Sequence, residues 1–328
     1  LKYSKNVAFG LLFYFLNIAL VLQFVSVGAS IMSERYTYLP YIGLAFIAGM
    51  ELDRFYTNTS PSLTTLKKIF VFVLVIYGLI FSSITYKRTK IWKNNETLWS
   101  DVIKKYPEKV DLAYKNRGNY YAREVNNYEK ALQDYNTFIK INPYDASIFS
   151  NRGNLYGLMK QFELSLADYS RALLIDSTHV ESYINRAVTY MAMKKYDLAL
   201  IDINKGILLN PEKLSGYKNR AYCYVNMLKN EEAIQEYNFL IKKQPDDYSH
   251  YFFRGIAYFN SKNYNNALVD FTKSIEVNST YAESYTNRSQ TYKILGDYKN
   301  AVNDVLKAKE LGIEINNKYV EELQALIK

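Results

Sequence analysis

The fold of this chain is decided by a motif near its middle. Residues 183–202 read YINRAVTYMAMKKYDLALID, in which the triplet Asn185-Arg186-Ala187 is followed by Tyr190 and later by the small residue Ala199. Small residues let two helices approach closely, and large rings fill the space around them. The stretch therefore predicts two helices packed against each other.

The same motif recurs with a nearly constant period. Its arginines are spaced 35, 34, 34, 34 and 34 residues apart, and a tyrosine follows each of them at the same offset. A fixed period of this length indicates a repeat protein. The arginines are Arg117, Arg152, Arg186, Arg220, Arg254 and Arg288, and the tyrosines are Tyr121, Tyr156, Tyr190, Tyr224, Tyr258 and Tyr292.

The repeat closely resembles the tetratricopeptide repeat, in which each unit is an antiparallel pair of helices, A and B. In the numbering of that repeat, the arginine is position 7 and the small residue after it is position 8. The resemblance implies an all-α fold with a superhelical solenoid of six repeats over residues 111–313. We expect an unpaired capping helix over residues 89–110, with Trp92 and Trp99 on its packed side. We also expect a C-terminal capping helix over residues 314–328, with Tyr319, Val320, Leu323 and Ile327 on one apolar stripe.

The first 88 residues have a different character, which predicts a membrane region. Three apolar segments, at about residues 7–29, 39–56 and 69–86, are candidates for transmembrane helices, since about 20 apolar residues cross a hydrocarbon core of ~30 Å. The uncharged run of the middle segment is short enough for a re-entrant segment as an alternative to a crossing. Basic residues are equally numerous on the two sides, so the positive-inside rule does not set the orientation.

The composition excludes several kinds of function. One cysteine and two histidines cannot build a disulfide framework or a Cys/His zinc site, and no glycine-rich phosphate loop is present, so we expect no metal and no cofactor. Of the net charge of +9, residues 1–90 hold +6, from nine basic and three acidic residues. The repeats are therefore nearly balanced and lack the basic stripe that nucleic acids require. We expect no nucleic-acid partner.

Each arginine of the motif is followed by an acid in the predicted B helix. The acid stands 16 residues after the arginine, or 17 in the first repeat, which has one inserted residue. Such regularity favours a structural ion pair over catalysis, since recurrent charges in stacked repeats usually serve stacking. We therefore predict no catalytic residue. The acids are Asp134, Asp168, Asp202, Glu236, Asp270 and Asp304.

Asparagine recurs at position 6, which faces the concave groove in tetratricopeptide solenoids. A carboxamide both donates and accepts hydrogen bonds, so a ladder of them can hold the backbone of an extended peptide. This ladder resembles the peptide-holding surface of the O-GlcNAc transferase solenoid. The alternative is that each asparagine only bonds its neighbours in the fold. The candidate groove residues are Asn116, Asn151, Asn185, Asn219 and Asn287, with Lys115 and Lys218 as sites for acidic groups.

A second resemblance lies between the first two apolar segments. Residues 33–40 read SERYTYLP and are followed by YIGL, close to the signature ERYTYLP.IGL of bacterial relatives of the transmembrane and tetratricopeptide repeat-containing O-mannosyltransferases. Those GT-C glycosyltransferases take a sugar from a lipid-linked phosphate donor. The resemblance implies that Arg35 contacts a lipid phosphate by charge-assisted hydrogen bonds. The alternative is an interfacial anchor, with aromatic rings at the level of the headgroups.

Two hypotheses about function follow. The chain is a membrane-tethered scaffold that binds an extended protein segment, or it is the C-terminal, acceptor-presenting part of a GT-C-like glycosyltransferase. The acidic loop that serves catalysis in that family is absent from these 328 residues, so we expect no transfer activity from them alone. The resemblance implies a multi-pass protein of a bacterial cytoplasmic membrane, with repeats on the non-cytoplasmic side. The expected partners are a protein segment, the lipid bilayer and a lipid-linked sugar.

Overall fold

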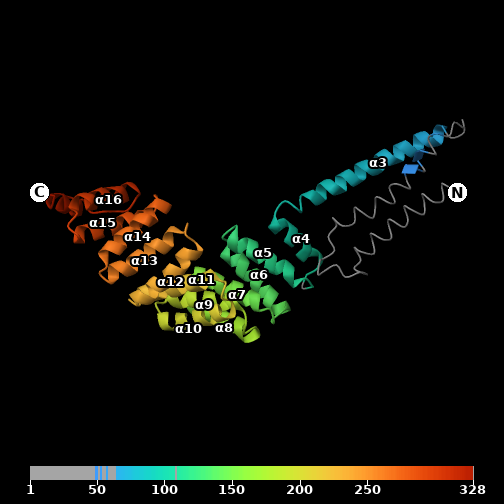
Figure 1. Cartoon of the computed structure of the whole chain (residues 1–328). Helices are drawn as coiled ribbons and strands as arrows, with labels where there is room; N and C mark the ends of the chain where they lie inside the picture. The colour runs from blue at the N-terminus through green and yellow to red at the C-terminus, as the bar shows by residue number, and fades with distance from the viewer. Residues whose placement is uncertain (1–48, 51, 54–56, 58–63, 108, 328) are drawn as a thin grey trace, which may run out of the picture. The chain divides into compact units, whose positions relative to one another are not determined.

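The computed structural model describes residues 49–50, 52–53, 57, 64–107 and 109–327, and this part of the chain contains helices but no strand. The chain divides into two compact units, residues 1–90 and 91–328. In the first unit the long helix α3, Thr64–Thr89, contains the segment 69–86 that the sequence predicts as helical (Figure 1). The predicted segment 7–29 and most of 39–56 lie outside the described residues, as does Arg35.

Many of the described apolar side chains of α3 are exposed, with 65% of Phe72 and 67% of Leu79 accessible. In the part of the chain that the structure describes, no helix is long and apolar enough to cross a membrane. The three membrane crossings therefore stay predictions.

The second unit is a right-to-left succession of paired helices in Figure 1, from α4 to the red C-terminus. Each repeat has an A helix of 13 residues and a B helix of 13 or 14. The repeats are α5 (Asp111–Arg123) with α6 (Tyr128–Ile141), α7 (Ala146–Leu158) with α8 (Phe162–Ile175), α9 (Val180–Ala192) with α10 (Tyr196–Leu209), α11 (Leu214–Asn226) with α12 (Asn230–Lys243), α13 (Tyr248–Asn260) with α14 (Tyr264–Val277), and α15 (Ala282–Ile294) with α16 (Tyr298–Glu310).

The helix before the repeats, α4, is shorter than predicted. It spans Asn95–Lys105, because Asn94 forms a capping box: its side chain accepts a hydrogen bond from the backbone N–H of Thr97, and the Thr97 hydroxyl accepts one from the backbone N–H of Asn94. Trp92 therefore lies in the preceding turn and is 48% exposed, instead of on the packed side of the helix.

The chain ends in a short helix, α17, Asn317–Ala325, which is capped by Asn316. Val320 and Leu323 are buried against the last B helix. Ile327, which the sequence places on the same apolar stripe, lies beyond the end of α17 and is 49% exposed.

Close approach of the two helices in a repeat depends on position 8. A Cβ atom added to Gly255 would lie 2.8 Å from the ring of Phe271, and one added to Gly118 would lie 2.7 Å from the ring of Tyr135. Both rings are buried, so they have little room to move aside. Glycine at these positions is therefore required by packing, although it weakens a helix intrinsically.

The turn from helix A to helix B uses one residue in the left-handed region. This residue is a glycine only in the last repeat, Gly296, with φ of 81°. The other repeats place an ordinary side chain there at some cost in strain. These residues are Asn126, Lys160, Lys194, Leu228 and Lys262, with φ between 55° and 61°.

Candidate functional site: the inner face of the repeats

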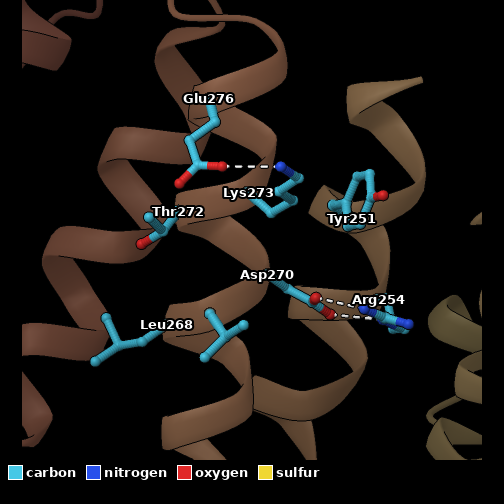
Figure 2. A pocket seen from close by; sticks show the side chains of 8 residues that line it. Tyr251, Arg254, Leu268, Asp270, Thr272, Lys273 and Glu276 are labelled. Atoms are coloured by element: carbon cyan, nitrogen blue, oxygen red, sulfur yellow. Dashed lines mark hydrogen bonds and ion pairs between the residues drawn. The ribbon is translucent and has the colours of Figure 1, made fainter. Parts of the chain in front are cut away.

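The position-7 arginines form a structural ladder, as the sequence predicts. Arg254 shows the pattern: Nε and Nη2 donate to the two carboxylate oxygens of Asp270, at 2.8 and 2.6 Å, in the fork drawn in Figure 2. The remaining Nη1 donates to Asn238 on the B helix of the preceding repeat. Each arginine therefore ties its own repeat to the one before it.

The same double attachment occurs at the other arginines. Nη1 of Arg117 donates to Ser100 on α4 at 2.9 Å, in the way the later arginines reach the preceding B helix. Helix α4 therefore takes the place of a B helix in front of the first repeat. Hydrogen bonds to the acids raise the pKa of Arg117 and Arg186 above the usual arginine value. These buried pairs are structural groups.

Figure 2 shows a hollow whose lining includes one of these arginine–acid pairs, Arg254 and Asp270. It has a volume of about 470 Å³ and lies between α13 and α14. Its charged side chains already have partners, because Lys273 is bound to Glu276 at 2.9 Å and Arg254 to Asp270. Nothing among its lining residues points to a ligand.

The A helices form the inner side of the solenoid. Consecutive A helices contact one another more extensively than consecutive B helices do in the described repeats. A stack whose A helices lie closer together must curve toward them. The position-6 asparagines lie on these A helices and are half-buried. That their side chains face the groove stays a prediction.

The structure divides the asparagine ladder into two groups. Asn151 donates to the side chain of Asn119 in the preceding repeat at 3.2 Å, and Asn287 donates to the carbonyl of Glu283 in its own helix at 2.8 Å. These two amides form hydrogen bonds within the fold, in agreement with the alternative that position-6 asparagines bond their neighbours. The other three make no side-chain hydrogen bond within the described residues and are Asn116, Asn185 and Asn219.

Both candidate lysines have partners inside the chain. Nζ of Lys115 lies 3.0 Å from a carboxylate oxygen of Asp145, and Nζ of Lys218 lies 3.2 Å from one of Asp247. Asp145 and Asp247 are the residues that cap the A helix of the next repeat. An acidic ligand would have to compete with these carboxylates, so the role predicted for the lysines stays a prediction.

The fifth repeat breaks the asparagine pattern and creates an aromatic site instead. Phe253 occupies position 6, and its ring packs edge-on against Tyr222 of the preceding A helix, with centroids 5.7 Å apart. Tyr222 is 36% exposed, so part of this ring pair faces solvent. The only sequence signal for it is the phenylalanine that replaces asparagine.

Metal binding has no support in the described residues, which hold no group of three His, Cys, Asp or Glu side chains placed to bind an ion. The single cysteine, Cys223, is free and buried, and burial raises its pKa to about 12. A thiol in this state is unreactive at neutral pH.

The fold and the repeated motif together define a tetratricopeptide-repeat solenoid. Residues 180–213, 249–281 and 282–311 match the family model of the tetratricopeptide repeat. These ranges correspond to the third, fifth and sixth repeats.

Comparison with curated proteins gives one informative relative. The human protein O-mannosyl-transferase TMTC1 is 30% identical over 154 residues, which are 46% of this chain and 17% of that protein. The chain therefore spans less than a fifth of the length of this relative.

Solved structures with TM-scores above 0.5 share the fold, and a further one is similar over part of the chain. A tetratricopeptide repeat protein from Parabacteroides merdae has 22% identity and a TM-score of 0.55, covering 76% of this chain and 97% of its own. PilF from Pseudomonas aeruginosa has 19% identity and a TM-score of 0.56, covering 66% and 96%. YrrB, described as a TPR protein with an unusual peptide-binding site, has 21% identity and a TM-score of 0.46, covering 54% and 92%.

Proposed function

We propose that this chain is a membrane-tethered scaffold whose inner face binds an extended segment of another protein. The observation that carries the proposal is the set of free amides at Asn116, Asn185 and Asn219. Each is half-buried, offers both a donor and an acceptor, and recurs at the same position of its repeat. Such groups match the peptide backbone, whose N–H and C=O groups are unpaired in an extended segment.

The ring pair Tyr222 and Phe253 adds a second element of recognition. Tyr222 lies on the same A helix as Asn219, and Phe253 replaces the asparagine at position 6 of the next repeat. A partly exposed aromatic pair next to an amide ladder favours an apolar side chain of the bound segment at that point. The amides would then hold the backbone, and the rings would select the sequence.

A peptide selected against the full chain from a phage-displayed library of unstructured peptides tests the groove. Replacing both Asn185 and Asn219 by alanine is expected to weaken binding of the peptide by at least about tenfold. The reason is that each substitution removes one hydrogen-bond donor group and one acceptor. The matched control is Asn287→Ala, because that amide already bonds its own helix. Binding is measured by fluorescence anisotropy, and stability by thermal unfolding. Equal affinities for the double variant and the control would contradict the groove.

The tether is proposed to be the region 1–88, with segments 7–29, 39–56 and 69–86 in a bacterial cytoplasmic membrane and the repeats on the non-cytoplasmic side. The lack of charge in most of these segments supports it. Separation of membranes from soluble protein tests the membrane attachment, and protease treatment of intact spheroplasts tests the side on which the repeats lie. Repeats that stay protected from the protease while the chain sediments with membranes would contradict the orientation.

The second candidate function is that of an acceptor-presenting part of a glycosyltransferase. It is favoured by the match to a protein O-mannosyl-transferase and by the motif at residues 33–40, with Arg35 as a contact for the phosphate of a lipid-linked sugar. The test is the coding sequence before Leu1. Further membrane segments with an acidic first loop would support the enzyme, and a start codon close to Leu1 would exclude it.

A further inference from the structure

Two neighbouring B helices carry an exposed apolar surface that the proposed groove does not use. It consists of Leu164 and Leu174 on α8 and of Leu198, Ile201 and Leu208 on α10, and we call it the outer apolar patch. These side chains are between 43% and 74% exposed. Positions 19 and 29 are leucine in both repeats, so the two helices present nearly the same stripe.

The patch is confined to these two repeats. In α6 the residues at positions 19 and 22 are Lys130 and Gln133, and in α12 they are Glu232 and Gln235. Val269 in α14 is apolar and 65% exposed, but position 29 of that helix is Glu276. An outward apolar stripe is therefore not a general property of B helices in this solenoid. Clustered exposed apolar side chains mark interaction surfaces.

The helices α8 and α10 belong to adjacent repeats, and both pack against α9. A single guanidinium joins them: Arg186 donates to Ser170 on α8 at 3.0 Å and to Asp202 on α10 at 2.7 Å. Residues at equivalent positions of two stacked repeats face the same way. The outer apolar patch therefore spans both helices.

Charged residues flank the patch in a regular order. Glu163 and Asp197 stand at the N-terminal ends of α8 and α10, and Arg171 and Lys205 stand eight residues later in each helix. All four are exposed and make no ion pair or hydrogen bond within the described residues. Each helix thus has a free acid before its stripe and a free base about two turns further along.

We propose that the outer apolar patch is the interface for a second copy of this chain. A twofold axis that lies in the plane of the interface and runs across the helices reverses their direction, so that α8 of one copy packs antiparallel on α8 of the other, and α10 on α10. The free acids of each copy then face the free bases of its partner, Glu163 against Arg171 on α8 and Asp197 against Lys205 on α10. A surface that complements itself in this way is what an isologous dimer requires. A lipid surface matches it less well, because the carboxylates would lie beside the headgroups and acyl chains.

The first experiment measures the dimer with matched variants of the full chain in detergent solution. Ile201→Lys places a charge in the centre of the patch, and Val269→Lys makes the same change at an equally exposed residue outside it. The dissociation constant, from sedimentation over a concentration series, is expected to rise on the order of 100-fold for Ile201→Lys, since the change occurs twice in a symmetric interface. Val269→Lys is expected to change it less than about threefold.

The second experiment exchanges the charges between copies. A chain with Glu163→Lys and Asp197→Lys, and one with Arg171→Glu and Lys205→Glu, should each dimerise weakly alone and associate when mixed, as detected by co-purification of differently tagged chains. A monomeric native chain overturns the proposal, as does equal weakening by the two lysine variants or failure of the mixture to associate. Binding of the monomer to phosphatidylcholine–phosphatidylglycerol vesicles that is lost in Ile201→Lys would assign the patch to lipid instead, and also overturns it.

Discussion

Arg220 meets Glu236 through Nη2 alone, at 2.7 Å, and its buried Nε has no hydrogen-bond partner. At the other five arginines, where the acid is an aspartate, Nε and Nη2 both donate to the carboxylate. The longer glutamate side chain reaches the guanidinium differently and loses the fork. Burial also raises the pKa of Glu236 above its usual value. The fourth repeat therefore has the weakest link of the ladder.

Glu236→Asp should stabilise the solenoid. Restoring the fork gives the buried Nε a charged acceptor, and we expect the free energy of unfolding to rise by about 1 kcal/mol after the loss of one methylene. Chemical denaturation measures it. The mirror variant, Asp202→Glu, breaks the fork at Arg186 and should lower the free energy of unfolding by about 1–2 kcal/mol. Two changes of the same sign would show that the fork does not decide the stability.

Gly255→Ala should destabilise the protein, although alanine is the better helix former. The new Cβ would meet the buried ring of Phe271 at 2.8 Å, and we expect a loss of about 1–3 kcal/mol in the free energy of unfolding. Gly157→Ala is the control, since its Cβ would meet the hydroxyls of Ser165 and Thr189 at the ordinary contact distances of 3.4 and 3.8 Å. That variant should be neutral or more stable by up to about 1 kcal/mol. Equal effects in thermal unfolding would refute the packing argument.

Leu228→Gly should stabilise the turn between α11 and α12. Leu228 has φ of 56° and is 69% exposed, so glycine removes backbone strain and few contacts. The gain is expected to be about 0.5–1 kcal/mol, because the greater entropy of unfolded glycine offsets part of the relief. Leu306→Gly, inside α16, should instead cost about 1 kcal/mol or more. A loss in both variants would mean that the left-handed conformation carries no strain.

Asp145 should make stability depend on pH. Burial raises the pKa of this carboxyl, but hydrogen bonds from Ser147 and Lys115 outweigh the burial and hold the pKa below its usual value. A depressed pKa in the folded state stabilises the fold above the unfolded pKa, and this contribution is lost as the pH falls through the folded pKa. Asp145→Asn should therefore cost about 0.5–1 kcal/mol at pH 7, reduced by partial exposure, and less at acidic pH.

The control for that titration is a double-mutant cycle with Lys115→Gln. If the pair is responsible, Asp145→Asn should have a smaller effect in the Lys115→Gln background, and its pH dependence should weaken. A deficit that stays constant between pH 7 and pH 3 would assign the effect to the cap of α7 instead of the charge.

The regular parts of the fold could be predicted from the sequence because they repeat. The period of the arginines sets the helix pairs, and the spacing of Arg186 and Asp202 puts both on facing sides of one pair, 2.7 Å apart. The ends of the helices are less predictable from the sequence, because each end depends on a single side chain. Because of the capping box at Asn94, α4 begins at Asn95 and Trp92 lies in the preceding turn.

Only part of the candidate site could be predicted from the sequence. Position 6 identified all five asparagines, but their sequence context does not distinguish Asn151, which bonds Asn119, from Asn185, which is free. The sequence predicts Lys115 and Lys218 as sites for acidic groups. In the structure, each is paired with the aspartate that caps the A helix of the next repeat. The aromatic pair Tyr222 and Phe253 was missed, because its rings meet only across two repeats.

By itself, the sequence determined the helical repeats, the small residues and rings that pack each pair, and the arginine–acid ladder, because these depend on spacings within one 34-residue unit. Only the tertiary structure decided which amides remain free, which lysines are already paired and why Arg220 lacks one bond. Those outcomes depend on side chains that stacking brings together from different repeats, as with Lys115 and Asp145, 30 residues apart. Stacking geometry, which no single unit encodes, selects among the partners that each unit offers.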